Sequence, residues 1–274
     1  MQVNGTALVT GASRGLGRAV AVELASRGFD VLATMRSPAD GEGLAEQAST
    51  LPGRVSVARL DVNDPGSIEI PDDLSVLVNN AGMEGPYLPV ETASLSVWRE
   101  IFETNLFGLI EVTQRALPVL RKRGGGVICN VTSCSILVPM PLFAAYRASK
   151  AAVSAMGESL RSEVGAFGIR VVEIQPGAIA TDMLAGSDRM PEATDAPGYA
   201  ELAQKVFEAR SGVGDAVTSP EEAARAIADA ILDDHAPLRN PCDPMGAGLL
   251  AAWRDSDDET MMSGMLSLFG ANTT

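Results

Sequence analysis

Tyr146 and Lys150 are the two side chains of this sequence best suited to proton transfer, because they lie four residues apart and can share one face of a helix. A tyrosine is a weak acid with an ordinary pKa of about 10. A neighbouring ammonium favours the phenolate and lowers that pKa. The pair could then give a proton to a substrate oxygen or take one from it. The spacing alone is common by chance, so its position in the fold decides its meaning.

A glycine-rich segment at 10–17 has the composition of a phosphate-binding turn, because Gly11, Gly15 and Gly17 lie between an apolar run and a helical pattern. Glycines let the backbone approach a pyrophosphate, and the start of the helix supplies N–H groups and a positive dipole. The spacing is GxxxGxG and not the GxGxxG of the usual dinucleotide fingerprint. The segment predicts nucleotide binding, with a simple tight turn as the alternative.

The end of the next apolar run indicates which nucleotide is bound. A cofactor without a 2′-phosphate usually meets an Asp or Glu there, which binds the ribose hydroxyls. This chain has Met35 and then Arg36. Together with Arg14 of the glycine-rich segment, Arg36 offers guanidinium groups, which suit a phosphate. The sequence therefore predicts NADP(H) in preference to NAD(H); the alternative is that both arginines simply face solvent.

Short apolar runs alternate with helical periods along most of the chain. Strands are expected at 6–10, 31–35, 55–60, 75–79, 127–132 and 170–175. Helices are expected at 15–27, 39–49, 95–121 with a break near 104–105, 144–167, 199–210 and 220–233, and again from about 248 after an irregular stretch that begins at 237. Short strands that are apolar on both sides and separated by helices indicate parallel βαβ units. We therefore predict an α/β fold, a single-domain Rossmann-type doubly wound parallel sheet with helices on both faces.

The chain is interpreted as one catalytic domain at 1–240 followed by a C-terminal extension at 241–274. The region 183–218, rich in Gly, Pro and charged residues, is expected to cover the substrate pocket as a mobile loop. The apolar side chains expected around that pocket are Leu88, Leu137, Met140, Leu142, Phe143, Met183, Leu184, Met190, Tyr199, Leu202 and Phe207. They favour a moderately hydrophobic ketone, aldehyde or alcohol as the substrate.

The composition excludes several classes of protein. A net charge of -14 argues against sequence-independent nucleic-acid binding and against a basic membrane-surface protein. Three cysteines without a CxxC pair, and a single histidine, support neither a disulfide framework nor a metal site. The sequence has no evident targeting segment and no apolar run long enough for a membrane span. We expect a soluble cytoplasmic protein without a metal, a nucleic-acid partner or a membrane span.

The order and approximate spacing of several motifs resemble the classical short-chain dehydrogenases/reductases. The motifs are TGASRGLG at 10–17, Asp61, NNAG at 79–82, Asn105, Ser133, YRASK at 146–150 and PG at 176–177. The resemblance covers roughly residues 3–240, and the ATMR and PLRNP segments resemble the branch that holds 17β-hydroxysteroid and retinol dehydrogenases. It implies an NADP(H)-dependent enzyme that interconverts a carbonyl and an alcohol on a small molecule, with reduction as the expected direction in cytoplasm.

The resemblance also implies roles for single residues. Tyr146 would be the general acid/base, and Lys150 would lower its pKa and hold the nicotinamide ribose. Ser133 would bind the substrate oxygen, and Asn105 would hold a water in a proton relay. The implied cofactor-binding residues are Gly11, Ser13, Arg14, Gly15, Leu16, Gly17, Arg36, Asp61, Val62, Asn79, Ala81, Gly82, Tyr146, Lys150, Pro176, Gly177 and Thr181.

Simpler interpretations stay open for some of these residues. Asp61 could be only a turn or cap residue, and Asn79 and Asn80 could be only loop formers. Thr132 and Ser135 are rivals of Ser133 for the substrate oxygen, although the spacing favours Ser133.

Two departures from the family pattern affect the outer parts of the fold. The stretch between Asp61 and Asn79 is short and contains Pro65 and Pro71. The helix that the family has in this stretch should therefore be shortened to about one turn. The usual glycine pair after the last strand is replaced at 238–241, so the tail should differ. A homodimer or homotetramer is expected by analogy with the family alone.

Two other functions compete with the dehydrogenase interpretation. One is a non-catalytic NADP(H)-binding sensor or regulatory protein, and the other is an isomerase or epimerase that uses a bound cofactor. The presence of Asn105, Ser133, Tyr146 and Lys150 together favours the enzyme over the sensor.

Overall fold

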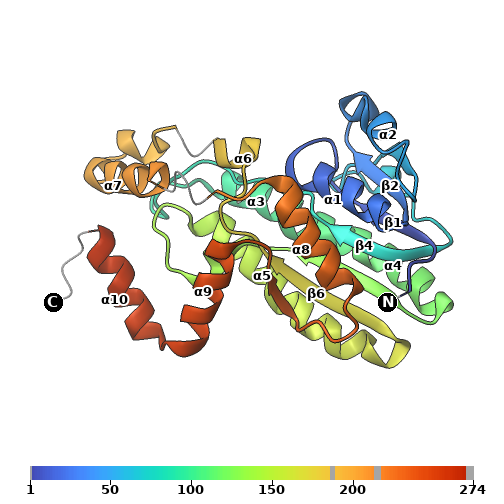
Figure 1. Cartoon of the computed structure of the whole chain (residues 1–274). Helices are drawn as coiled ribbons and strands as arrows, with labels where there is room; N and C mark the ends of the chain where they lie inside the picture. Colours follow the sequence, from blue (N-terminus) through green and yellow to red (C-terminus); the bar gives the residue numbers. More distant parts are fainter. Residues whose placement is uncertain (1, 186–188, 213–216, 270–274) are drawn as a thin grey trace.

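The computed structural model describes residues 2–185, 189–212 and 217–269, which are arranged around a parallel sheet (Figure 1). The strands are β1 (Thr6–Val9), β2 (Asp30–Met35), β3 (Val55–Arg59), β4 (Leu74–Asn79), β5 (Gly126–Val131), β6 (Ile169–Gln175) and β7 (Arg239–Pro241). Their order is β3-β2-β1-β4-β5-β6-β7, and each neighbouring pair is parallel. The chain winds outward from β1 to β3 on one side and from β4 to β7 on the other, which confirms the predicted doubly wound fold.

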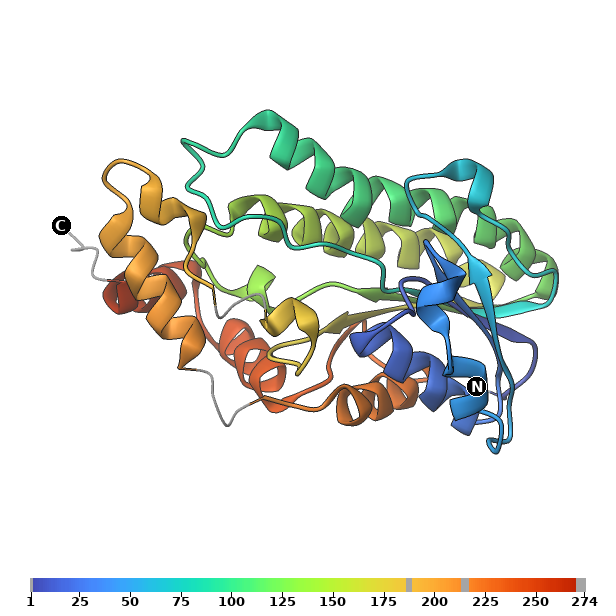
Figure 2. The same cartoon turned by 90° about the horizontal axis from the view of Figure 1, so that it is seen from above.

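Helices cover both faces of the sheet (Figure 2). The helices of the first face are α1 (Gly15–Ser26) and α8 (Pro220–Leu232), and those of the second are α3 (Leu95–Phe102), α4 (Gly108–Arg123) and α5 (Ala144–Val164). Side chains alternate along a strand, so β1 sends Ala7 and Val9 into the first layer and Leu8 into the second. Burial on both faces explains why the central strands are apolar in most of their positions. No helix in the described ranges has the length together with the low polarity that crossing a lipid bilayer requires.

The break expected near 104–105 is a π-helical turn, η3 (Glu103–Phe107), inserted between α3 and α4. Single π turns inside α-helices are frequent at functional sites. Asn105 lies in this turn and is fully buried, so the turn directs a polar side chain into the interior of the molecule.

Two connections beside β3 are short. The helix expected at 39–49 is divided into η1 (Pro38–Gly41) and α2 (Leu44–Gln47), because Gly43 between them has a left-handed φ of 75°. Between β3 and β4 only the 3₁₀ turn η2 (Pro65–Ser67) forms, as the short connection predicted.

The prediction of an irregular tail was wrong, because the sheet gains a seventh strand, β7, beside β6. This strand has only three residues and includes Pro241, which cannot donate to a ladder and is tolerated at a sheet edge. So short a strand leaves little pattern in a sequence. The next helix, α9 (Pro244–Asp255), begins before position 248, and α10 (Asp258–Phe269) follows it. Residues 270–274 of the expected extension lie outside the described residues.

The segment between β6 and α8 contains α6 (Asp182–Ala185), the 3₁₀ turn η7 (Glu192–Asp195) and α7 (Ala200–Ser211). Its two ends lie side by side, since Ile179 and Thr218 form a parallel bridge. Of the loop expected at 183–218, residues 186–188 and 213–216 lie outside the described residues.

Candidate active site

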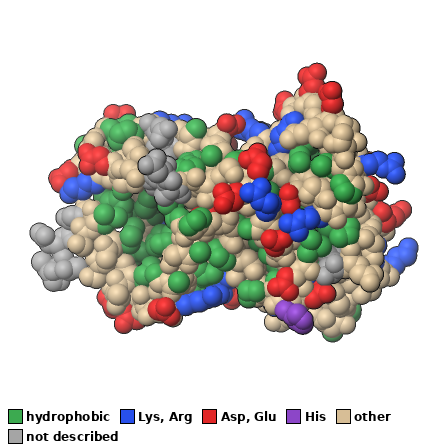
Figure 3. Space-filling model, in the orientation of Figure 1, with side chains coloured by type: hydrophobic (Ala, Val, Ile, Leu, Met, Phe, Trp, Pro, Cys, Tyr) green, Lys and Arg blue, Asp and Glu red, His purple; other side chains and the backbone are tan. Residues whose placement is uncertain are grey.

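A cavity of about 930 Å³ lies at the carboxyl ends of the parallel strands, where open α/β sheets bind ligands. Of the predicted site residues, those that line it are Gly11, Ser13, Arg14, Gly15, Leu16, Gly17, Arg36, Asp61, Val62, Ala81, Gly82, Ser133, Tyr146, Lys150, Pro176, Gly177 and Thr181. The other two, Asn79 and Asn105, lie behind its wall. Figure 3 shows hydrophobic side chains gathered between α7 and α9 on one face of the molecule.

The glycine-rich segment forms a turn with little room for side chains. Gly11 and Gly15 have φ values of 66° and 55°, which residues with a Cβ rarely adopt. A Cβ on Gly17, in the first turn of α1, would overlap the carbonyl oxygen of Gly11 and the side-chain amide of Asn80. The turn therefore presents bare backbone and the N-terminus of α1 to the cavity, which is the arrangement that holds an anionic pyrophosphate.

Thr10 and Asn80 fix this turn against the end of β4. The Thr10 hydroxyl accepts the backbone N–H groups of Asn80 and Ala81, both at 3.0 Å. The Asn80 side-chain amide donates to the carbonyls of Thr10 at 2.9 Å and Gly11 at 3.1 Å. Asn80 is therefore a positioning residue that sequence reasoning missed. Its signal was the pair of asparagines at the end of a buried strand.

Two exposed arginines line the cavity, one after β2 and one in the glycine-rich turn. Arg36 is exposed and follows the last residue of β2. Arg14 is also exposed, and its Nε lies 3.3 Å from the carboxylate of Asp182. Asp61 lines the cavity nearby and accepts the backbone N–H of Asn63 at 3.0 Å. Asp61 therefore has the turn role considered above, and it also lies on the cavity wall.

One wall of the cavity, called the reactive wall below, carries Ser133, Tyr146 and Lys150. Tyr146 and Lys150 lie on the same face of α5, with the lysine Nζ 5.9 Å from the centre of the tyrosine ring. The ammonium donates to the carbonyl of Val131, at the end of β5, at 2.8 Å. Ser133 follows that strand and acts on the Tyr146 hydroxyl so as to lower its pKa. Two hydroxyls and an amine therefore lie on one wall where a substrate oxygen can approach.

The contacts of Thr132 separate it from Ser133. The Thr132 hydroxyl donates to the carboxylate of Glu173 at 2.8 Å and to the backbone carbonyl of Ile174 at 3.0 Å. Both acceptors belong to β6, so this hydroxyl already has its hydrogen-bond partners within the sheet. The Ser133 hydroxyl accepts the backbone N–H of Ser135 at 3.1 Å and caps the 3₁₀ turn η4 (Cys134–Leu137). This geometry favours Ser133 over Thr132 as the partner of a substrate oxygen.

Burial shifts the acidity of both groups on the reactive wall. It raises the pKa of Tyr146, and the negative charge of Glu84 raises this pKa further, while the hydrogen bond from Ser133 acts in the opposite direction. Burial lowers the pKa of Lys150 to about 8. We expected the lysine to lower the pKa of the tyrosine. The shift has the opposite sign because the lost solvation of the buried phenolate outweighs the stabilising hydrogen bond from Ser133.

Asn105 connects the loop after β4 to α5. Its Oδ1 accepts the backbone N–H of Met83 at 2.8 Å, and its Nδ2 donates to the Met83 carbonyl and to the Ser149 hydroxyl, both at 2.9 Å. Gly82 lies between this amide and the lysine, since a Cβ there would be 3.2 Å from Asn105 Oδ1 and 3.3 Å from Lys150 Nζ. Gly82 therefore separates the buried Asn105 from Lys150 on the reactive wall.

Asn79 acts within the sheet. Its side-chain amide donates to Thr113 of α4 and to Asn130 of β5, both at 2.9 Å. It therefore joins β4 to its neighbours below the cavity. This is the support of the central strands that the family resemblance implied.

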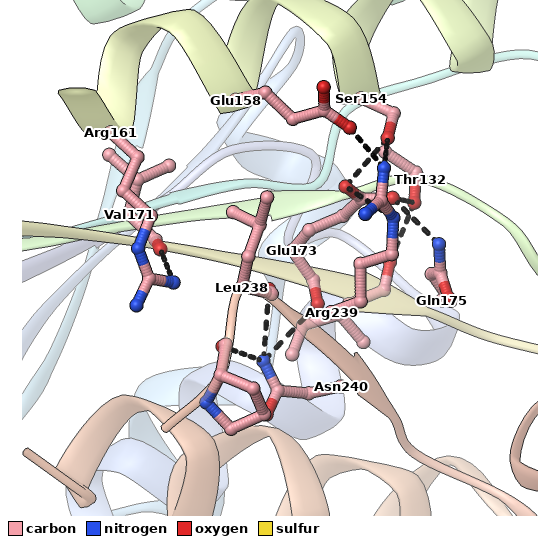
Figure 4. A network of polar contacts seen from close by, with 12 residues as sticks. Thr132, Ser154, Glu158, Arg161, Val171, Glu173, Gln175, Leu238, Arg239 and Asn240 are labelled. Atoms are coloured by element: carbon pink, nitrogen blue, oxygen red, sulfur yellow. Dashed lines mark hydrogen bonds and ion pairs between the residues drawn. The ribbon is translucent and has the colours of Figure 1, made fainter. Parts of the chain in front are cut away.

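A buried glutamate lies behind the reactive wall (Figure 4). Glu173 of β6 is only 2% exposed and accepts hydrogen bonds from Thr132 at 2.8 Å, Ser154 at 2.8 Å and Gln175 at 2.9 Å. Arg239 of β7 lies 4.0 Å from the same carboxylate. The network joins β5, β6, β7 and α5 and so holds the strand and the helix that carry the reactive side chains. Sequence reasoning missed it, although an acidic residue inside an apolar strand was a usable signal.

The segment after β7 closes another side of the cavity. Asp243 accepts the backbone N–H groups of Gly177 at 2.6 Å and Gly246 at 2.9 Å, which ties the N-terminus of α9 to the loop after β6. Met245 and Leu249 of α9 consequently line the cavity. These two residues were not predicted to line it, although an Asp directly before a Pro is a frequent helix start.

The apolar lining differs in part from the expected set. Met140, Phe143, Met183 and Leu184 line the cavity as predicted. The expected residues outside the lining are Leu88, Leu137, Leu142, Met190, Tyr199, Leu202 and Phe207. Leu142, Tyr199 and Leu202 pack with Phe269 of α10 in a cluster that borders the cavity. The helix α7 reaches the cavity through Val206 and Arg210.

Two charged side chains lie among these apolar ones. Glu84 comes from the loop after β4 and Arg210 from α7, and their nearest oxygen and nitrogen atoms are 3.7 Å apart. The Arg210 guanidinium also lies 3.7 Å over the centre of the Tyr87 ring. Burial raises the pKa of Glu84. Neither residue was predicted, because the two lie far apart in the sequence and belong to no motif.

Comparison with known proteins is consistent with this geometry. Residues 5–192 match the short chain dehydrogenase family. The chain is 37% identical over 257 residues to the uncharacterized oxidoreductase YusZ of Bacillus subtilis, covering 89% of each protein. It is 31% identical over 255 residues to human retinol dehydrogenase 8, covering 85% of this chain and 80% of that protein.

A solved structure adds a match in three dimensions. The short chain dehydrogenase of Burkholderia cenocepacia in complex with NADP aligns with a TM-score of 0.76 and 25% identity, covering 97% of this chain and 99% of that one. The family match extends over more than half of the sequence, and the relatives cover most of it. This chain, with its glycine-lined turn and its serine, tyrosine and lysine on one wall, belongs to the short-chain dehydrogenase/reductase family.

Proposed function

We propose that this protein is an NADP(H)-dependent oxidoreductase that interconverts a carbonyl and an alcohol on a moderately hydrophobic small molecule, mainly in the direction of reduction. The observation that carries the proposal is the placement of Ser133, Tyr146 and Lys150 in one cavity with a glycine-lined turn. Membership of the family supports oxidoreductase chemistry on such groups.

The chain's own residues fit a dinucleotide. The positive φ values of Gly11 and Gly15, and the lack of room for a Cβ at Gly17, leave a backbone cradle at the start of α1 for a pyrophosphate. Thr181 lies beside this turn, since a Cβ on Gly15 would be 3.2 Å from its Cγ2, and Gly177 lines the same cavity. When bound, the nicotinamide supplies or accepts the hydride at the substrate carbon.

A preference for NADP(H) follows from the charges at the end of β2. Met35 and Arg36 occupy the positions where a ribose-binding carboxylate would be expected, and Arg14 of the glycine-rich turn is a second exposed cation on the cavity wall. The contact between Arg14 and Asp182 joins two exposed side chains, so it contributes only about 0–1 kcal/mol and a phosphate can replace it. The NADP in the Burkholderia cenocepacia relative supports the same preference.

Tyr146 and Ser133 act directly on the substrate oxygen. In reduction, the Tyr146 hydroxyl gives its proton to the oxygen while the Ser133 hydroxyl orients and polarises it. The raised pKa of Tyr146 keeps the phenol protonated, which suits an acid at the start of a reduction. Lys150 and Asn105, which flank Gly82, would return a proton to the tyrosine after each turnover.

The walls of the cavity support a hydrophobic substrate. Met140, Phe143, Leu184 and Val206 line the part of the cavity beyond the reactive wall. Retinol dehydrogenase 8 is named for a hydrophobic alcohol, and its 31% identity to this chain supports the same class of substrate.

The test is oxidation of NADPH with a panel of ketones and aldehydes, with NADH as the control. Wild type should consume NADPH in proportion to the carbonyl compound, and Tyr146→Phe should lower kcat by at least about 100-fold while still binding NADPH. A sensor would bind the cofactor without consuming it. An isomerase or epimerase would convert substrate without net consumption, so either result would refute the proposal.

A further inference from the structure

We propose that Arg147 of α5 is a positioning residue, which holds the Ser133 hydroxyl in the place from which it binds a substrate oxygen beside Tyr146. The inference rests on the proposed function and adds a residue on which its reacting geometry depends. Arg147 lies between Tyr146 and Lys150 in the sequence and takes no part in the proton transfer proposed above.

The guanidinium of Arg147 contacts the turn that follows Ser133. Its Nε donates to the backbone carbonyl of Ser135 at 2.7 Å, and a longer contact of 3.5 Å joins its Nη2 to the carbonyl of Ile136. Both carbonyls belong to the 3₁₀ turn η4. The side chain therefore joins α5, which carries Tyr146, to the turn that begins at Ser133.

The two residues that Arg147 contacts are the same two that bind Ser133. The backbone N–H of Ser135 donates to the Ser133 hydroxyl oxygen at 3.1 Å, and that of Ile136 donates to the Ser133 carbonyl at 3.3 Å. A serine hydroxyl that accepts one hydrogen bond can still donate its own proton. The turn therefore fixes the oxygen of Ser133, while the proton can be donated to a substrate oxygen.

The surroundings of Arg147 give its contacts with η4 particular weight. The side chain is half-buried, and burial lowers its pKa. Its charge forms no ion pair within residues 2–185, 189–212 and 217–269. Burying an unpaired charge is costly, so the hydrogen bonds to the carbonyls of η4 are what compensate the guanidinium for lost water.

A second contact holds the same turn from the sheet. The backbone N–H of Cys134, the first residue of η4, donates to the carbonyl of Pro176 at 2.9 Å. This bond fixes where the turn begins, and Arg147 fixes the two residues that follow. Removing the guanidinium should therefore loosen the turn around Ser133 without detaching it from β6.

The experiment is a double-mutant cycle on kcat, measured with NADPH and the ketone that wild type reduces fastest in the panel above. Ser133→Ala should lower kcat about 100-fold, because it removes a group that polarises the substrate oxygen. Arg147→Met keeps an extended side chain without donors and should lower kcat about tenfold, because Ser133 is then less well placed. In the Ser133→Ala background, Arg147→Met should lower kcat by less than about twofold, because the group that it positions is already gone.

The matched control is Arg161→Met on the same helix. The Arg161 guanidinium also donates to a backbone carbonyl, but to that of Val171 in β6, at 3.2 Å (Figure 4). Its loss should change kcat by about twofold or less, and equally with and without the Ser133 hydroxyl. If Arg147→Met has the same effect in both backgrounds, or no effect, the proposal is overturned and the reductase stays intact.

A second measurement follows the turn itself and needs no turnover. The backbone N–H groups of Ser135 and Ile136 are bound to Ser133, so hydrogen exchange of residues 133–138 reports how firmly the turn is held. Exchange should be at least about tenfold faster in Arg147→Met and unchanged in Arg161→Met. If Arg147→Met does not fold, Arg147→Lys replaces it in both measurements, because a lysine keeps the charge but lacks the fork that spans two carbonyls.

The two measurements separate this inference from the proposed function. If wild type reduces no compound of the panel, the proposed function fails, and hydrogen exchange alone then decides the role of Arg147. Faster exchange in Arg147→Met than in Arg161→Met would support Arg147 as the residue that holds Ser133. Equal exchange in the two variants would overturn it.

Discussion

Replacing Glu173 with glutamine should destabilise the protein, because the change keeps the shape of a buried side chain and removes the charge to which its neighbours donate. The carboxylate accepts hydrogen bonds from Thr132, Ser154 and Gln175 at 2.8 Å, 2.8 Å and 2.9 Å. Hydrogen bonds to a charged group contribute about 1.5–3 kcal/mol, and neutral ones about 0.5–1.5 kcal/mol. Each of these contacts should therefore weaken by about 1 kcal/mol.

Two further effects enter the estimate for Glu173→Gln. A neutral amide has a smaller desolvation cost in this site, which offsets part of the loss. The ion pair with Arg239 is long, at 4.0 Å, and adds little. We therefore expect the free energy of unfolding to fall by about 2 kcal/mol.

Thermal unfolding of the cofactor-free protein measures this change. For a domain of this size a loss of 1 kcal/mol lowers Tm by about 2–4 °C, so Glu173→Gln should lower it by about 4–8 °C. The matched control is Glu158→Gln, because Glu158 pairs with the same arginine but its side chain is 50% exposed. A surface pair contributes about 0–1 kcal/mol, so this variant should lose less than about 4 °C. A Glu173→Gln protein as stable as wild type, or a control that loses as much, would refute the reasoning.

Two further predictions concern the cofactor site and the lysine. Arg36→Ala should weaken NADPH binding by about tenfold or more and change NADH binding little, because only NADPH carries the 2′-phosphate; equal losses in a fluorescence titration would contradict this. Burial lowers the pKa of Lys150 from 10.5 to about 8, so the unfolded chain binds more protons at this position between those pH values. The free energy of unfolding of wild type minus that of Lys150→Met should therefore rise with pH through this window, and denaturant unfolding that gives a constant difference would count against a neutral buried lysine.

The central strands and helices could be predicted because each carries a complete local signal. The strand β4 is buried along its whole length and is apolar in four of its six positions, and α5 repeats its buried positions with helical spacing. The candidate catalytic side chains could be placed together because parallel strands end at one edge of the sheet, so motifs far apart in the chain meet there. Local pattern and topology together were enough to locate the reactive wall.

The features that were missed depend on contacts between distant segments. The edge strand β7 has three residues and forms only because β6 provides a partner for it. Glu173 and Arg239 belong to neighbouring strands that lie far apart in the sequence, and the same holds for Glu84 and Arg210. The direction of the Tyr146 pKa shift also could not be predicted from spacing, because it depends on burial, which only the packed structure defines.

The parallel bridge between Ile179 and Thr218 has a consequence for how such a protein can diversify. The bridge holds the two ends of the intervening segment side by side. The distance between these ends therefore stays the same whatever residues the segment contains. The entropy of closing a loop grows only slowly with its length, so segments of very different size can be inserted between these two anchors at little cost in stability. Exchanging that segment between relatives should therefore transfer substrate preference as a module, while Ser133, Tyr146 and Lys150 stay in place.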